Sequence, residues 1–174
     1  MKIEQTKIAG LVVINSEPFK DNRGFFNRIF CRKELETIRP NIVIAQINHS
    51  MTKTKGTIRG MHFQYPPYSE MKIIRCTKGS VFDVAVDLRE DSPTFLQWYG
   101  EILSAENMKM LVVPEGCAHG FQSLEDDIET IYMSTSPYYR EAESGVRYND
   151  PKVRIQWPLP ISIISDKDRN WRDL

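Results

Sequence analysis

The segment Arg59-Gly60-Met61-His62-Phe63-Gln64 places a histidine three residues after an arginine. Histidine is the one side chain whose unperturbed pKa lies close to neutral pH, so it can take up or release a proton there. The arginine is permanently charged and can hold an anion nearby. A base beside an anion-binding group indicates acid–base chemistry on a phosphorylated substrate.

A second histidine and a lysine could join this chemistry. His119 follows the turn-forming residues 114–116, and a strand after that turn could present it to the same interior as His62. Lys72 lies in an otherwise apolar segment, so it could face a cavity and stabilise an oxyanion by its charge. His62 could instead be a structural residue that lines a barrel. Lys72 could instead be a solvated side chain with no role in the chemistry.

Two histidines that face one interior also suggest a metal site, because histidine is the commonest metal ligand. However, position 64 is glutamine, so there is no His-x-His pair, and Glu70 is the nearest downstream carboxylate. A catalytic metal is therefore the minor alternative, and we expect neither a metal nor another cofactor.

Short β-branched and aromatic runs, separated by turn residues, must position these side chains. The clearest strand is 80–88, where one face has the apolar residues Phe82, Val84, Val86 and Leu88 and the other face has Asp83, Ala85 and Asp87. The other expected strands are 11–14, 25–30, 43–48, 71–76, 96–103, 110–113, 119–124 and 128–134, with a short helix at 32–38. Residues from Pro158 onward should wrap the surface. The pattern predicts an all-β sandwich or barrel, such as a jelly roll, with a few short helices.

The bulk properties restrict the class of protein. A length of 174 residues suits one domain, 1–174, and 23 basic against 23 acidic residues give no net charge, which argues against a nucleic-acid binder. No apolar run could span a bilayer, and the N-terminus lacks a signal-peptide core. Three widely spaced cysteines favour a reduced, cytoplasmic protein.

Short blocks that run through nearly the whole chain form a specific pattern. They are Asp21–Phe26, Gln46–Ser50, Arg59–Gln64, Asp83–Arg89, Ser92–Phe95, Leu103–Asn107, Pro114–Phe121, Tyr148–Pro151, Trp157-Pro158 and Ser165–Asp168. In this order they resemble the dTDP-4-dehydrorhamnose 3,5-epimerase family. The resemblance implies a cupin-type jelly roll and a homodimer that needs no metal.

The resemblance also implies a reaction. The family acts on a nucleoside-diphospho-4-keto-6-deoxyhexose, most often dTDP-4-dehydro-6-deoxy-D-glucose, whose C3 and C5 protons lie alpha to the C4 ketone. By resemblance, His62 removes such a proton and Tyr132 returns one to the opposite face. Lys72 matches a lysine near the C4 oxygen, and Asp168 matches the aspartate that orients the histidine. Asp83 is a weaker candidate for that supporting role.

The remaining matched positions are implied substrate contacts. They are Arg59 and His119 at the sugar-phosphate end, Gln46 and Asn48 along the nucleotide, Tyr138 stacked on the base, and Arg23, Glu143 and Lys167 elsewhere. A stacking ring tolerates any base, because every base has a π face.

The sequence departs from the family pattern at Arg28, where an Arg-Gly-x-Phe-x-Glu pattern usually ends in glutamate. A carboxylate acceptor is thereby replaced by a cation that only donates. Arg28 stays among the expected substrate contacts, but thymine, cytosine or another base, or a different sugar, are all possible.

Other activities stay open at this stage. A 3-epimerase that acts at one centre would use the same base and acid, and a 3,4-ketoisomerase shares the histidine base. A non-catalytic module that binds sugar nucleotides and a metal-dependent cupin oxygenase are the alternatives from other classes.

Overall fold

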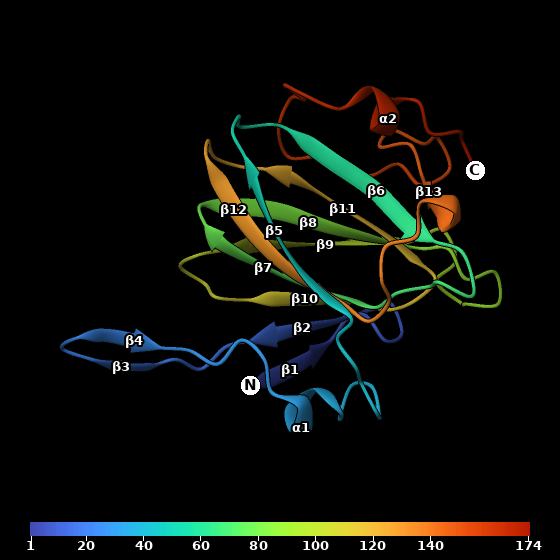
Figure 1. Cartoon of the computed structure of the whole chain (residues 1–174). Helices are drawn as coiled ribbons and strands as arrows, with labels where there is room; N and C mark the ends of the chain where they lie inside the picture. Colours follow the sequence, from blue (N-terminus) through green and yellow to red (C-terminus); the bar gives the residue numbers. More distant parts are fainter.

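The computed structural model describes all residues, 1–174, and strands dominate it (Figure 1). The strands are β1 (Lys2–Gln5), β2 (Val12–Asn15), β3 (Phe19–Asp21), β4 (Gly24–Phe26), β5 (Gln46–Thr52), β6 (Ile58–Gln64), β7 (Lys72–Lys78), β8 (Ser80–Asp87), β9 (Trp98–Ser104), β10 (Met110–Val113), β11 (Cys117–Ser123), β12 (Ile128–Ser134) and β13 (Glu143–Gly145). The helices are α1 (Arg32–Leu35), α2 (Asp166–Arg169) and a 3-10 turn, η1 (Arg140–Ala142).

Two antiparallel sheets face each other, as Figure 1 shows. One has the strand order β1-β2-β10-β7-β12-β5, and the other has the order β13-β6-β11-β8-β9. From β5 to β12 the chain passes repeatedly from one sheet to the other, with only β8 and β9 consecutive in the same sheet. This is the all-β jelly roll with short helices that the sequence predicts.

The apolar core lies in three layers. Between the sheets, a cluster of 13 buried residues includes Ile74 of β7 and Ala85 of β8. A second cluster covers the outer face of the six-stranded sheet and includes Leu35 of α1. A third covers the outer face of the five-stranded sheet and includes Val84 of β8 and Val153 from the chain after β13. Because both faces of the central strands are covered, they form a rigid frame for side chains that point inward.

The boundaries differ from prediction where tertiary pairing overrides local chemistry. Strands 110–113 and 128–134 lie where predicted, as β10 and β12. The strand predicted at 43–48 is instead β5, whose polar residues 48–50 continue the ladder because β12 pairs with β5 along its whole length. The predicted strand 25–30 is formed only as β4, and the predicted helix 32–38 only as α1. The helix α2 was not predicted.

Two peripheral segments matter for the site. The hairpin of β3 and β4 projects from the body as an arm, on the left of Figure 1, and its Phe19, Phe25 and Phe26 are mostly exposed. The chain from Pro158 onward wraps the surface beside β6, as predicted, with a bridge between Ile164 and Ile58. Neither α1 nor α2 exceeds four residues, and no helix has the length and apolar character of a membrane span.

Candidate active site

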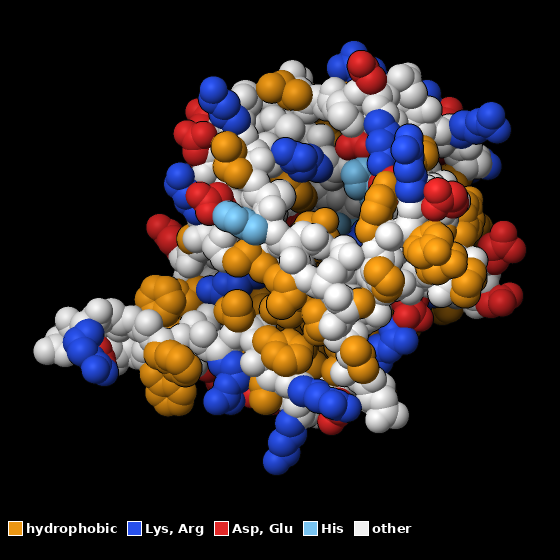
Figure 2. Space-filling model, viewed as in Figure 1, with side chains coloured by type: hydrophobic (Ala, Val, Ile, Leu, Met, Phe, Trp, Pro, Cys, Tyr) orange, Lys and Arg blue, Asp and Glu red, His pale blue; other side chains and the backbone are white.

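A cavity of about 450 Å³ opens between the sheets, and its mouth faces the viewer in Figure 2, with histidine visible inside. The predicted residues that line it are Arg59, His62, Lys72, His119, Tyr132, Lys167 and Asp168. A second hollow shares His62, Lys72 and Tyr132 with it and adds the predicted Gln46, Asn48, Tyr138 and Glu143. The structure therefore brings most of the predicted site residues into one cleft with two compartments.

His62 projects from β6 and forms a tight pair with Asp168 of α2. His62 Nε2 lies 2.6 Å from Asp168 Oδ1, and since a carboxylate only accepts, Nε2 donates. In the neutral imidazole the lone pair is then on Nδ1. Asp168 Oδ2 accepts from the Gly60 amide at 3.1 Å, and the Asp168 amide donates to Ser165 Oγ at 3.1 Å. Both ends of the aspartate are thus fixed, which fixes the imidazole.

Asp168 is buried, although a run of charges such as Asp166-Lys167-Asp168 would ordinarily be solvated. Burial by itself would raise the pKa of Asp168, but the hydrogen bonds and charge from His62, with the Gly60 amide and Ser165, lower it below its ordinary value. The carboxylate therefore stays charged at neutral pH and can stabilise a protonated His62.

Two packing features hold this pair in place. Gly60 has φ +129°, and a Cβ at this position would approach Gly120 Cα to 2.5 Å, so only glycine lets β6 lie this close to β11. On the other side, the Trp171 ring meets the His62 ring edge-on, with centroids 6.3 Å apart. Lys167 Nζ lies 5.7 Å from the Trp171 ring.

Tyr132 reaches the cavity from β12, on the sheet opposite His62. Burial, with a further contribution from the charge of Glu70, raises its pKa above the ordinary value, although Arg59 opposes this. Tyr132 consequently keeps its proton at neutral pH and can donate it. Lys72 of β7 also enters the cavity, and its Nζ lies 2.9 Å from Glu70 Oε1.

His119 and Arg59 occupy another wall. Asp83 Oδ1 lies 2.9 Å from His119 Nε2, so Asp83 orients His119 rather than His62, the role for which the sequence made it a candidate. The cause is the register, because β8 pairs with β11, the strand of His119, and not with β6. Arg59 Nε donates to Thr52 Oγ1 at 2.9 Å and Arg59 Nη2 donates to the Met51 carbonyl oxygen at 3.1 Å, which together fix the guanidinium.

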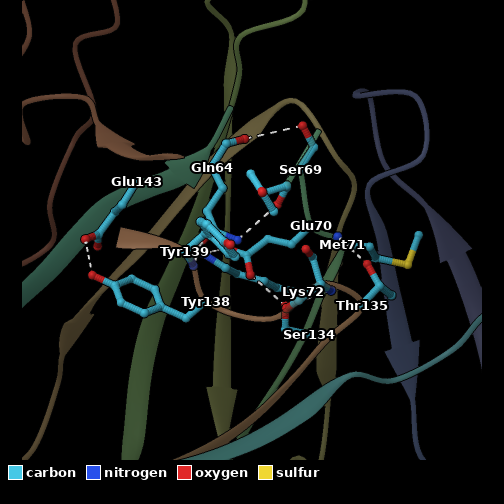
Figure 3. Close-up of polar contacts among 12 residues, drawn as sticks. Gln64, Ser69, Glu70, Met71, Lys72, Ser134, Thr135, Tyr138, Tyr139 and Glu143 are labelled. Atoms are coloured by element: carbon cyan, nitrogen blue, oxygen red, sulfur yellow. Dashed lines mark hydrogen bonds and ion pairs between the residues drawn. The ribbon is translucent and has the colours of Figure 1, made fainter. Parts of the chain in front are cut away.

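A polar chain lines the outer compartment, part of which Figure 3 shows. Tyr138 Oη donates to Glu143 Oε2 at 2.7 Å, and Lys167 Nζ lies 2.6 Å from Glu143 Oε1. Burial opposes the charge of Glu143, but these two partners outweigh it and lower the pKa of Glu143. Gln46 Oε1 accepts from the Tyr138 amide at 3.0 Å, whereas Asn48 Nδ2 is buried and has no hydrogen-bond partner.

Arg23 and Arg28 lie outside this cleft. Arg23 is at the tip of the β3–β4 arm and pairs with Asp21, at 2.6 Å. Arg28, near the base of the arm, pairs with Glu34 at 3.2 Å. Both were expected to contact substrate, yet neither lines the cavity of its own chain.

The sequence reasoning overlooked Glu70 as a partner of Lys72, and it overlooked Ser134 and Trp171. Glu70 had been considered only as a metal ligand. Its spacing of two residues from Lys72 could have revealed it, since both side chains then lie on one face of an extended chain. No local pattern marks Trp171. Nowhere in the structure do three His, Cys, Asp or Glu side chains gather as a metal-binding group.

A jelly roll whose interior holds a histidine–aspartate pair, a tyrosine and a lysine has the fold and the proton-transfer groups of a cupin-type isomerase. The family model for dTDP-4-dehydrorhamnose 3,5-epimerase matches residues 5–174. The chain belongs to this family of sugar-nucleotide epimerases, as its sequence suggested.

Relatives and solved structures agree with this. The chain is 42% identical over 171 residues to the dTDP-4-dehydrorhamnose 3,5-epimerase of Shigella flexneri, covering 98% of this chain and 94% of the relative. The crystal structure of the Bacillus anthracis 3,5-epimerase, with TDP and pyrophosphate bound, superposes with a TM-score of 0.95 at 42% identity over 99% of both chains. The Legionella pneumophila enzyme, in complex with dTDP-4-keto-L-rhamnose, has a TM-score of 0.94 at 38% identity, over 99% and 92% of the chains.

Proposed function

We propose that this protein inverts C3 and C5 of dTDP-4-dehydro-6-deoxy-D-glucose, in a reaction that needs no metal or cofactor. The observation that carries the proposal is the placement of His62 and Tyr132 on opposite sheets of one cavity. A sugar ring between them has a base on one face and an acid on the other. Two groups on opposite faces can invert a centre, whereas one group could only exchange the proton and restore it.

The proposed reaction begins with proton transfer to His62. Nδ1 takes the proton at C3 or C5, and the electrons of the broken C–H bond form an enolate with its charge on the C4 oxygen. Lys72 stabilises that oxyanion, a contribution typically worth about 10²–10³ in rate. Tyr132 Oη then gives its proton to the opposite face of the same carbon. Proton exchange with solvent restores His62 and Tyr132 for the second centre.

Asp168 assists by stabilising the imidazolium that forms after proton abstraction. The positive charge on His62 develops 2.6 Å from a carboxylate that also accepts from the Gly60 amide, and the Asp168 backbone amide is held by Ser165, so little reorganisation is needed. Positioned general acid–base catalysis of this kind contributes about 10²–10⁴ in rate.

The proposed substrate lies across both compartments. Arg59 and His119 contact the sugar-phosphate end, and Tyr138 stacks on the base at the outer compartment. Gln46, Asn48, Glu143 and Lys167 are the remaining contacts in this proposal. The thymidine nucleotides in the two related crystal structures support thymine as the base.

We also propose a homodimer. Arg23 and Arg28 match substrate-binding positions of the family but lie away from their own cavity, so a second copy would have to bring them to it. The exposed Phe19, Phe25 and Phe26 of the arm are the apolar surface such a contact needs. We further propose that the protein is a single cytoplasmic domain with no nucleic-acid or membrane partner.

Deuterium uptake tests the proposed reaction. The purified protein is incubated in D₂O with dTDP-4-dehydro-6-deoxy-D-glucose, and the ring protons are followed by NMR. We expect loss of both the C3 and C5 proton signals and formation of the C3, C5-inverted product, with no change after treatment with a chelator. Deuterium at neither carbon would contradict an epimerase function.

A second candidate function is epimerisation at C3 alone. A 3'-monoepimerase from Streptomyces bikiniensis, in complex with dTDP-quinovose, superposes with a TM-score of 0.90 at 29% identity, over 97% of this chain and 85% of the relative. The fold and family thus accommodate both outcomes. Deuterium at C3 only, in the same experiment, would select this candidate.

A further inference from the structure

Glu70 forms an ion pair inside the cleft that the proposed reaction has not used. Its Oε1 lies 2.9 Å from Lys72 Nζ, and its Oε2 accepts from Ser134 Oγ at 2.6 Å (Figure 3). The side chains of Glu70 and Lys72 are only 10% and 12% exposed. The carboxylate is therefore held at both oxygens, and it lines the outer compartment.

The two strands around this pair fix its geometry. Lys72 begins β7, and Ser134 ends β12 as its direct register partner. Both strands belong to the six-stranded sheet, so the anchor of Glu70 lies across the ladder from the stem of Lys72. Movement of Glu70 is restricted from both sides.

A fixed carboxylate matters because lysine is flexible. Its ammonium sits on a four-carbon stem and points wherever its partners hold it. The carboxylate of Glu70, 2.9 Å away, holds the ammonium by its charge, and the ammonium has three N–H donors with which to reach an oxygen in the cavity. Without Glu70, the charge of Lys72 would be buried without compensation, and the ammonium would move toward other acceptors.

We propose that Glu70 is a positioning residue, anchored by Ser134, that aims the ammonium of Lys72 at the C4 oxygen of the substrate. This inference rests on the proposed function. Glu70 touches Lys72 and not the reacting carbons, so it acts on the enolate only through Lys72. Loss of Glu70 should then slow the chemical step more than it weakens substrate binding. The reason is that the positive charge of Lys72 must lie at the C4 oxygen when the negative charge of the enolate forms there.

The test is a double-mutant cycle on kcat and KM. Glu70→Gln keeps the size of the side chain and removes its charge. We expect kcat to fall by at least about tenfold, but by less than the roughly 10²–10³-fold loss for removing an oxyanion donor, with KM changed much less. In a Lys72→Met background, Glu70→Gln should cause no further loss of kcat.

The chain offers a matched control. Glu101 holds Lys109 at one oxygen, at 2.7 Å, and accepts from Tyr99 Oη at the other, also at 2.7 Å, but it lies on β9 outside the cleft. Glu101→Gln should leave kcat and KM as they are. This control distinguishes an effect on the position of Lys72 from a general effect of breaking any Lys–Glu pair.

Two outcomes would overturn the inference. The first is a wild-type kcat for Glu70→Gln. The second is a loss of kcat from Glu70→Gln that is equally large whether Lys72 is present or not. If Glu70→Gln does not fold, Ser134→Ala replaces it, with a smaller loss of kcat expected only when Lys72 is present. The unmodified protein is assayed alongside in D₂O, where no deuterium uptake would reject the proposed function itself and this inference with it.

Discussion

The His62–Asp168 pair joins residues that are 106 positions apart in the chain. Their types and the resemblance made both candidates, but only the fold shows that Asp168 is buried and held by Gly60 and Ser165. Local reasoning fails for Asp168 because its neighbours Asp166 and Lys167 are exposed and it differs from them only through its tertiary contacts.

The buried Asp168 should leave a signature in acid stability. Its pKa in the folded protein lies below the ordinary value of 3.8, so the unfolded chain binds the proton more readily. The stability it contributes is complete above pH 3.8 and is lost as pH falls through the lower folded-state pKa. We expect Asp168→Asn to be less stable than wild type at neutral pH, with a difference that narrows below pH 3.8.

Denaturant unfolding at about pH 7, 5 and 3 measures this difference. The control is Asp91→Asn, at an exposed position, which should follow the wild-type curve. A difference between wild type and Asp168→Asn that stays constant over this range would show that the charge of Asp168 does not stabilise the fold.

At the scale of elements, strands are predictable where apolar periodicity and pairing agree. Strand β10 lies at the predicted position because its residues are apolar and all buried, and β12 does so because it pairs with β5 along its whole length, although its ladder to β7 shifts register between Glu129 and Thr130. The helix α2 escapes prediction because four residues cannot form a stable helix alone. It exists because Ser165 caps its first turn and because Asp168 is held against β6.

The C-terminal segment also depends on a glycine of β13. A Cβ at Gly145 would clash with the Trp171 ring and approach the Met61 carbonyl oxygen to 2.6 Å. We expect Gly145→Ala to reduce the free energy of unfolding by about 1–3 kcal/mol, as overpacking does. It should also displace Trp171 and so lower the activity that depends on His62.

Pairing this change with Trp171→Ala tests the cause. Removal of the indole frees the space that the new methyl group needs, so the double variant should be less destabilised than the sum of the single variants, by at least about 0.5 kcal/mol. Strict additivity in thermal or denaturant unfolding would mean that Gly145→Ala acts by another route.

At the scale of the whole molecule, the family resemblance and strand pattern were enough to predict the jelly roll and most of the cleft. They could not show that Arg23 and Arg28 lie on a projecting arm, since sequence blocks carry no information on which copy of the chain a residue serves. In the proposed homodimer, the departure at Arg28 would concern the contact between copies as much as the nucleobase. The ion pair of Arg28 with Glu34 places it at the base of the arm.

A mixing experiment tests the shared site. If Arg23 serves the partner's cavity, Arg23→Ala and His62→Asn each impair every site of their own homodimers. In a one-to-one mixture that has exchanged subunits at random, about a quarter of all sites would contain both intact residues. We expect the mixture to regain activity toward that fraction. Activity no higher than the mean of the two separate variants would argue that Arg23 serves no partner site.

The central claim is that His62 and Tyr132 act on opposite faces of one carbon, and deuterium exchange by their variants tests it most directly. In D₂O with the 4-keto-6-deoxy sugar nucleotide, Tyr132→Phe should still take up deuterium at C3 through His62 but form no epimer. The variant His62→Asn should show neither exchange nor epimerisation. Full epimerisation by Tyr132→Phe, or normal turnover by His62→Asn, would contradict the account.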